Sequence, residues 1–398
     1  MDLRQVFLKN VAQTSQFPLA LEFTKAEGVY LIDKEGKEYI DLISGISVSN
    51  MGHCHPDVVK AIKNQAETYL HQMVYGEFVQ APQVQLAKAL TDSLEDYETP
   101  YGKIDNVYFV NSGTEAVEGA MKLAKRFTGR TEIISFQKAY HGSSQGALSL
   151  GDEDFKRNFR PLLPEIRKIE RENFEQLNRI STKTAAVFFE PIGGESGVRP
   201  TSPKYIRALR QRCTETGTVL VFDEIQSGLG RTGNLWAFED YKIVPDVLLS
   251  AKGLGGGMPI GAFMAPTEIM KVLRENPILG HITTFGGHPV SCAAALANFR
   301  AWQREISPSE TKRKGELFKK LLSHPKIKSV RGTGLMLAAE VGDFDYLLKV
   351  IDHTIKNGVV TDWFLYCDDS MRIAPPLIIS DEQIATACKT ILSALDKA

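Results

Sequence analysis

Two side chains, Lys252 and Asp223, each follow an apolar run and have the types and spacing to do chemistry together. Lys252 comes after Val247–Ala251 and before a glycine-rich stretch, which lets backbone or a flat ligand approach closely. Because a lysine in such surroundings is poorly solvated, its charged form is disfavoured and its neutral amine can act as a nucleophile. Asp223 ends the run Thr218–Phe222, about one strand–helix–strand unit upstream. The pair indicates amine chemistry supported by a nearby carboxylate.

An amine and an acid at the ends of neighbouring strands suit pyridoxal phosphate (PLP) as a cofactor. The lysine forms a Schiff base with it, and the aspartate keeps its pyridine nitrogen protonated. The run that ends in Asp223 and Glu224 also resembles the strand that holds magnesium in P-loop ATPases, but such a site needs a Gly-x-x-x-x-Gly-Lys-Ser/Thr loop upstream. The Gly-Lys pairs at 36–37 and 102–103 are not followed by serine or threonine, so the ATPase hypothesis is rejected.

The segment Ser112-Gly113-Thr114 lies between an apolar strand, Asn106–Val110, and a helical pattern, Val117–Phe127. A strand that runs into a helix through such residues presents free backbone N–H groups and hydroxyls at the positive end of the helix dipole. This arrangement is typical of a phosphate cup. An ordinary helix N-cap is the alternative interpretation of the same residues.

Four further side chains follow apolar runs or interrupt them. Tyr140 comes after a strand, where an aromatic ring can stack on a planar cofactor, and Glu190 ends an apolar run, where a carboxylate needs a partner. Glu195 lies in a glycine-rich loop, and Arg372 sits in an apolar segment and is suited to bidentate binding of a carboxylate. Taken singly, Tyr140 is better explained as a surface or core aromatic and Arg372 as part of a structural ion pair, and Glu195 as a solvated acid is also open.

Short apolar strands alternate with helical segments between residues 106 and 265, which predicts a mostly parallel sheet covered by helices. The expected strands are 106–110, 131–136, 185–189, 218–222 and 246–250. A hairpin is expected within 28–42, and helices are expected at 56–72, 82–95, 290–303 and 309–323. After residue 290 the pattern predicts a smaller α+β domain with strands at 326–330, 335–341 and 371–373. We therefore expect an α/β protein with an N-terminal segment (1–45) that joins the small domain, a large domain (46–289) and a small C-terminal domain (290–398).

Composition narrows the class of protein. The chain has 398 residues and a net charge of −1, which gives no sign of nucleic-acid binding. No apolar run has the length of a membrane span, and the first residues do not form a signal peptide. The five cysteines are scattered, and the histidines of Gly52–Pro56 lack the spacing of a metal site. We expect a cytoplasmic enzyme with reduced thiols and no bound metal.

These motifs together resemble the class III (fold type I) PLP-dependent aminotransferases, nearest to the acetylornithine and ornithine aminotransferases. The resemblance extends from Gly28–Asp33 to Arg372–Pro376, and its most specific parts are Asp223–Gly233 and the Lys252 segment. It implies a large domain with a mostly parallel, seven-stranded sheet, a smaller α+β domain and a homodimer with shared active sites.

The resemblance also assigns roles around the cofactor. Lys252 would hold PLP covalently, Asp223 would pair with the pyridine nitrogen and Gln226 would approach the phenolic oxygen. The ring would lie between Ile225 and Tyr140. Ser112, Gly113 and Thr114 would bind the phosphate within one subunit. Thr284 would reach across the dimer interface to the phosphate of the other subunit. His141 and Glu190 would support these groups from behind.

The substrate residues implied by the resemblance are Arg372, Glu195, Thr283 and Ser143. Arg372 would bind the α-carboxylate of 2-oxoglutarate or glutamate, and Glu195 would mask it while an ω-amino donor is bound. Family members carry an arginine for the donor's α-carboxylate where this chain has Ser143. A serine cannot replace a bidentate guanidinium, so the donor is different or another arginine serves.

The expected reaction moves an amino group from an acetylornithine- or ornithine-like donor to 2-oxoglutarate, by a ping-pong route through pyridoxamine phosphate. The alternatives within the class are a 4-aminobutyrate or other ω-amine transaminase, an aminomutase, a racemase and a decarboxylase. A PLP-binding regulator is the alternative outside enzymes, and no appended DNA-binding segment supports it.

Overall fold

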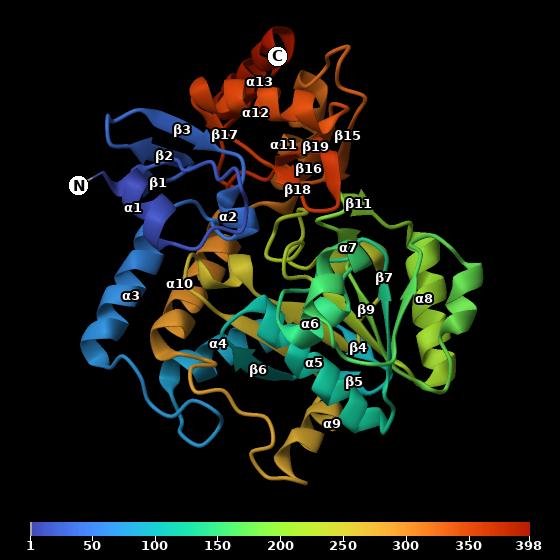
Figure 1. Cartoon of the computed structure of the whole chain (residues 1–398). Coiled ribbons are helices and arrows are strands. Elements are labelled where there is room, and N and C mark those ends of the chain that lie inside the picture. Colours follow the sequence, from blue (N-terminus) through green and yellow to red (C-terminus); the bar gives the residue numbers. More distant parts are fainter. Residues whose placement is uncertain (1) are drawn as a thin grey trace.

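A seven-stranded sheet forms the centre of the larger part of the molecule in the computed structural model, which describes residues 2–398 (Figure 1). Its strands lie in the order β6 (Asn106–Val110), β14 (Gly261–Ala265), β13 (Val247–Ser250), β12 (Val219–Asp223), β9 (Thr184–Phe189), β7 (Glu132–Phe136) and β8 (Ile166–Ile169). β14 is antiparallel to both of its neighbours, whereas the pairs from β13 to β8 are parallel. The predicted α/β class and mostly parallel seven-stranded sheet are confirmed.

Five of these strands were expected from the sequence, and β8 and β14 were not. β8 is an edge strand with the sequence Ile-Arg-Lys-Ile. Its two middle residues are charged, so it contains no apolar run that would predict a strand. β14 reads Gly-Ala-Phe-Met-Ala and contains no β-branched residue, although it is fully buried. Burial between two neighbours outweighs its weak intrinsic preference for a strand.

Helices cover both faces of this sheet (Figure 1). α5 (Gly113–Thr128) packs its small apolar residues against β14, β13 and β9. α8 (Pro203–Thr216) packs against β12. α3 (Pro56–Thr68) and α4 (Ala81–Asp92) pack against α10 (Pro289–Glu305). The shorter elements of this part are α6 (Gln145–Ser149), α7 (Glu153–Lys156), α9 (Thr267–Met270), β4 (Glu98–Thr99), β5 (Gly102–Lys103), β10 (Ile192–Gly193) and β11 (Arg199–Pro200).

The C-terminal part is built on an antiparallel sheet with the order β15 (Ser329–Thr333), β16 (Met336–Glu340), β19 (Cys367–Ile373) and β18 (Trp363–Phe364). The helices of this part are α11 (Pro308–Leu321), α12 (Phe344–Lys356) and α13 (Asp381–Lys397). It lies at the top of Figure 1, in orange and red. The strand expected at 326–330 begins three residues later, at Ser329, because the preceding residues form a turn.

The N-terminal strands associate with the C-terminal part. β1 (Phe23–Glu27), β2 (Tyr30–Asp33) and β3 (Glu38–Asp41) form a meander, and β17 (Val359–Val360) extends it by pairing in parallel with β3. α1 (Leu3–Asn10) precedes this meander and α2 (Ser44–Ser47) follows it. The domain boundaries at residues 45 and 289 stay a prediction. In the described residues, 2–398, no helix is long and apolar enough to cross a membrane.

Candidate active site

A cavity of about 530 Å³ lies where the strands of the large sheet end. Segments that follow β6, β7, β9, β12 and β13 all contribute side chains to its wall. This is where a mostly parallel sheet is expected to bind its ligand. The predicted site residues that line it are Ser112, Gly113, Thr114, Tyr140, His141, Ser143, Glu190, Glu195, Asp223, Ile225, Gln226 and Lys252.

Lys252 is separated from β13 only by Ala251, and it turns into the cavity with a left-handed backbone, φ 45°. Gly253 comes next because a side chain there would overlap the amide of Asn50. Burial lowers the pKa of Lys252, although the charge of Glu195 acts in the opposite direction. The amine therefore loses its proton more readily than that of an exposed lysine, as a nucleophile requires.

Asp223 lies at the end of β12, the strand next to β13, and its carboxylate is almost completely buried. Its Oδ2 lies 2.7 Å from Nδ1 of His141, and its Oδ1 accepts the N–H of Ile225 at 3.1 Å. These two contacts fix the direction in which the carboxylate faces the cavity. Glu190 is close by: its Oε1 accepts the N–H of Gly194 at 3.1 Å, and burial raises the pKa of its carboxyl group.

The Ser112–Thr114 segment begins helix α5. Ser112 is the N-cap, and its Oγ accepts the N–H of Glu115 at 3.3 Å, whereas the N–H groups of Gly113 and Thr114 precede the first intrahelical bonds. The hydroxyl of Thr114 is held by the N–H of Ser144 at 3.1 Å. Donors of this kind at the positive end of a 16-residue helix fit a phosphate group. A side chain at Gly113 would lie 2.9 Å from Cδ1 of Ile225, so the cradle and Ile225 are immediate neighbours.

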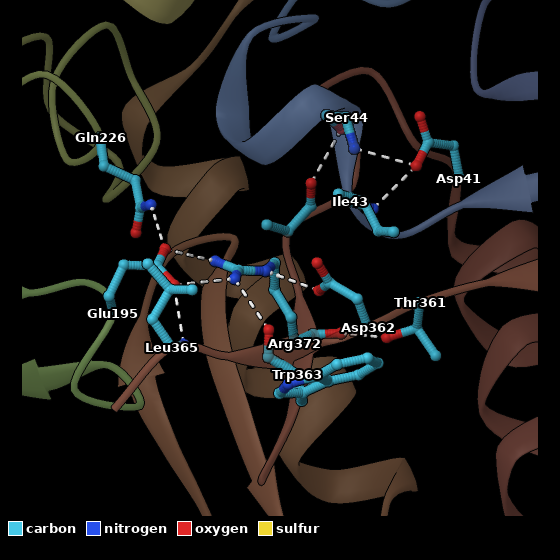
Figure 2. Close-up of polar contacts among 11 residues, drawn as sticks. Asp41, Ile43, Ser44, Glu195, Gln226, Thr361, Asp362, Trp363, Leu365 and Arg372 are labelled. Carbon is cyan, nitrogen blue, oxygen red and sulfur yellow. Dashed lines mark hydrogen bonds and ion pairs between the residues drawn. The ribbon is translucent and has the colours of Figure 1, made fainter. Parts of the chain in front are cut away.

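Arg372 and Glu195 form a buried ion pair behind one wall of the cavity (Figure 2). Nη1 and Nη2 of Arg372 donate to Oε1 and Oε2 of Glu195 at 3.0 and 3.1 Å. Burial acts to raise the pKa of Glu195, but the charge and hydrogen bonds of Arg372 outweigh it and lower that pKa to about 2. Gln226 donates to the same carboxylate at 3.0 Å, which connects it to the cavity wall. The carboxylate of Glu195 thus lies between Arg372 and Gln226 and is hydrogen-bonded to both.

Comparison with known proteins agrees with this geometry. Residues 11–395 match the family described as Aminotransferase class-III. The chain belongs to the class-III aminotransferases. It is 39% identical to the acetylornithine aminotransferase of Methanopyrus kandleri over 99% of both chains, and 37% identical to that of Methanocaldococcus jannaschii over 95% of this chain and 93% of the relative.

Solved structures give the same result for this class-III aminotransferase. The ornithine aminotransferase of Toxoplasma gondii superposes with a TM-score of 0.90 at 30% identity, over 100% of this chain and 94% of that one. An omega-transaminase from Thermomicrobium roseum superposes with a TM-score of 0.89 at 27% identity, over 99% and 97%. A second T. gondii ornithine aminotransferase structure is described with partial occupancy of PLP at its active site. The resemblance stated from the sequence is confirmed, as are the fold type I architecture and transaminase activity.

Besides Arg372, two predicted site residues of the aminotransferase do not line the cavity. Thr283 accepts the amide of Asn111 at 3.0 Å, so it touches a residue of the wall. Thr284 is exposed and does not line the cavity. Ser143 is on the wall, and its hydroxyl lies 3.2 Å from that of Tyr140. The roles assigned to all these residues stay predictions.

One residue of the Arg372 cluster, Asp362, was not expected from the sequence. Asp362 lies 2.7 Å from Nε of Arg372, and the carbonyl of Trp363 accepts from Nη2 at 3.0 Å (Figure 2). The N–H of Leu365 donates to Glu195 at 3.2 Å. Residues 362–365 precede β19 and carry no recognisable motif, so only the folded hairpin reveals their contact with the site.

Proposed function

We propose that this class-III aminotransferase uses PLP to move an ω-amino group from an acetylornithine- or ornithine-like donor to 2-oxoglutarate in two half-reactions. The observation that carries the proposal is the meeting of Lys252, Asp223 and the N-terminus of α5 at one cavity. An amine, a buried carboxylate and a phosphate cradle are the three groups that PLP needs.

The residues present fit PLP. Lys252 would hold it, Asp223 would keep its pyridine nitrogen protonated, and the cradle of Ser112, Gly113 and Thr114 would bind its phosphate. When bound, PLP supplies an electron sink for the carbon that carries the amino group. Displaced from the cofactor, Lys252 would then act as the base that moves the proton of that carbon. His141 would hold Asp223 in place at 2.7 Å.

The two substrates would be distinguished by the Arg372–Glu195 pair. With Glu195 in place, Arg372 offers no free edge to the α-carboxylate of an amino acid, so an ω-amine can enter without competition. With Glu195 displaced, the guanidinium would bind the α-carboxylate of 2-oxoglutarate in bidentate form. The pair is therefore proposed to act as a gate between the two half-reactions.

Transfer of the donor's terminal nitrogen to 2-oxoglutarate can be measured directly. Purified holoenzyme given a panel of ω-amines, each labelled with ¹⁵N at the terminal amine, should change the absorption of its bound cofactor. Addition of 2-oxoglutarate should then yield ¹⁵N-glutamate. Release of carbon dioxide, or a rearranged amine without glutamate, would replace the proposal with a decarboxylase or an aminomutase.

Ser143 leads to a prediction about the donor. Replacing Ser143 with arginine should improve acetylornithine as donor by about 1–3 kcal/mol of transition-state binding, roughly 5- to 150-fold in kcat/KM, because a charged hydrogen bond to its carboxylate is gained. Ser143→Gln is the matched control, since it adds length without charge. High native activity on acetylornithine that neither substitution changes would contradict this account of the donor.

A homodimer with shared active sites is the second part of the proposal. Apolar side chains are exposed on two neighbouring segments, with Val79 93% and Ile278 76% exposed. A cavity of about 510 Å³ lies between residues 74–77 and 278–286. A second copy of the chain would cover this surface and bring Thr284 toward the other subunit's phosphate cradle.

Hybrid dimers test this arrangement. Lys252→Ala subunits mixed with Thr284→Ala subunits should regain activity above the mean of the separate proteins, because one site of each hybrid has both residues intact. Sedimentation at assay concentration provides the control for assembly. A fully active monomer, or a mixture no better than the mean, would refute shared sites.

A further inference from the structure

Two carboxylates contact Arg372, and they occupy different edges of its guanidinium (Figure 2). Glu195 takes the terminal edge, formed by Nη1 and Nη2, at 3.0 and 3.1 Å. Asp362 takes the side edge through Nε at 2.7 Å, while the carbonyl of Trp363 accepts from Nη2 at 3.0 Å. The ring of Phe364 lies 4.4 Å from the guanidinium carbon. The arginine is thus held from the side, from one face and from the end.

The two carboxylates differ in what anchors them. Asp362 immediately precedes β18, the neighbour of β19. Its carbonyl accepts the N–H of Arg372 at 2.9 Å, and the hydroxyl of the adjacent Thr361 donates to the carbonyl of Arg372 at 2.6 Å. Glu195 lies on a loop of the larger part, next to Gly194 and near Gly197, and it lines the cavity. Asp362 is therefore tied to the backbone of Arg372 itself. Glu195 touches the same hairpin through its carbonyl, which accepts the N–H of Tyr366 at 3.0 Å, so its side chain can turn away from Arg372 while its backbone stays in place.

Displacement of Glu195 would be costly if it were the only partner of Arg372. A buried guanidinium that loses its sole carboxylate is left uncompensated, which is strongly unfavourable. Its released side chain would also have to be ordered again when the next carboxylate binds. Burial acts to lower the pKa of Arg372, but Glu195 and Asp362 together outweigh it and raise that pKa. With Asp362 in place, the arginine keeps its charge and a partner after Glu195 has left.

From these contacts, and resting on the proposed function, we infer that Asp362 is the positioning residue that holds Arg372 ready for the oxo acid while Glu195 is displaced. Its bond to Nε leaves the terminal edge of the guanidinium directed to the place where Glu195 was. An incoming carboxylate then exchanges for Glu195 one for one, and the net charge of the cluster stays constant. This geometry selects a planar carboxylate that binds in bidentate form.

Glutarate, an unreactive dicarboxylate, is the probe, and its binding to holoenzyme is measured by calorimetry. The background is Glu195→Ala, so that Glu195 does not compete. In that background Asp362→Ala should raise the Kd of glutarate at least about tenfold, a cost of about 1.4 kcal/mol. Asp362→Asn keeps an acceptor for Nε but not the charge, so its Kd should lie between those of the parent and of Asp362→Ala. The half-reaction with an ω-amine should be unaffected by either change in the presence of Glu195.

The matched control is Asp368→Ala, which removes one exposed negative charge from the same strand as Arg372. It should leave the Kd of glutarate unchanged. Unaltered glutarate binding by Asp362→Ala, or an equal loss in both half-reactions together with a lower Tm, would overturn the positioning role. If Arg372→Ala itself leaves glutarate binding intact, the failure belongs to the proposed carboxylate site and not to Asp362 alone.

Discussion

Replacement of Lys252 by alanine should lower the rate of transamination by roughly 10⁴-fold, because the proton transfer proposed for this amine would be lost. The protein should still fold and still bind PLP without a covalent bond, since the phosphate cradle and Asp223 remain. Lys138 provides a matched control: it also follows a strand of the large sheet with a left-handed backbone, φ 55°, but it is exposed. Lys138→Ala should keep full activity. A Lys252→Ala protein that turns over at the native rate would disprove the role of this amine.

The pH dependence of cofactor attachment follows from the same residue. Burial lowers the pKa of Lys252 from the ordinary lysine value of 10.5. A lowered pKa means that the neutral, reactive amine is present at lower pH than in a solvated lysine. Attachment of PLP to the apo-protein should therefore reach half its maximal rate clearly below pH 10.5. A midpoint at or above that value would show that the amine is not desolvated.

Replacement of Asp223 by asparagine should leave PLP bound but lower the rate by about 10³-fold, because a neutral amide does not keep the pyridine nitrogen protonated. The loss should appear in kcat rather than in KM, since Asp223 is proposed to stabilise charge that develops during the reaction. The absorption of the bound cofactor should shift as its nitrogen loses the proton.

Asp246 offers a control for this substitution. It is buried and immediately precedes β13, the strand next to β12. Its carboxylate lies 2.9 Å from Arg210 and accepts the N–H of Leu220 at 2.7 Å. Asp246→Asn should lower the Tm while the rate per folded molecule stays native. If Asp223→Asn also changes only stability, its carboxylate has no part in the chemistry.

The sequence predicted the parts of the site that strand ends bring together. Runs that end at Glu190, Asp223 and Lys252 are continuous and apolar, so their burial in one sheet and the convergence of their last residues could be foreseen. β14 was missed because its weak strand preference is overcome only by its two neighbours. The contact between residue 362 and residue 372 depends on the β18–β19 pairing, which no local pattern encodes.

The left-handed backbone of α2 could not be predicted from the sequence either. All four residues of α2 have a left-handed backbone, with φ between 52° at Ser44 and 65° at Ser47. For a β-branched residue such as Ile46 that conformation is strained, and it persists only when the surrounding structure holds it in place. Ser44 donates to the carbonyl of Ala374 at 2.8 Å, and Asp41 accepts the N–H groups of Ile43 and Ser44 (Figure 2). These contacts tie the N-terminal segment to the turn that follows Arg372, and they arise only in the folded chain.

Borohydride reduction of the holoenzyme followed by peptide mapping tests the central claim most directly. If Lys252 holds the cofactor, reduction fixes it permanently, and the pyridoxyl group is found on the peptide that contains Lys252 and on no other. Prior addition of an ω-amino donor should prevent that labelling, because the donor frees the lysine. A label on any other lysine, or a label on Lys252 that the donor does not prevent, would contradict the account.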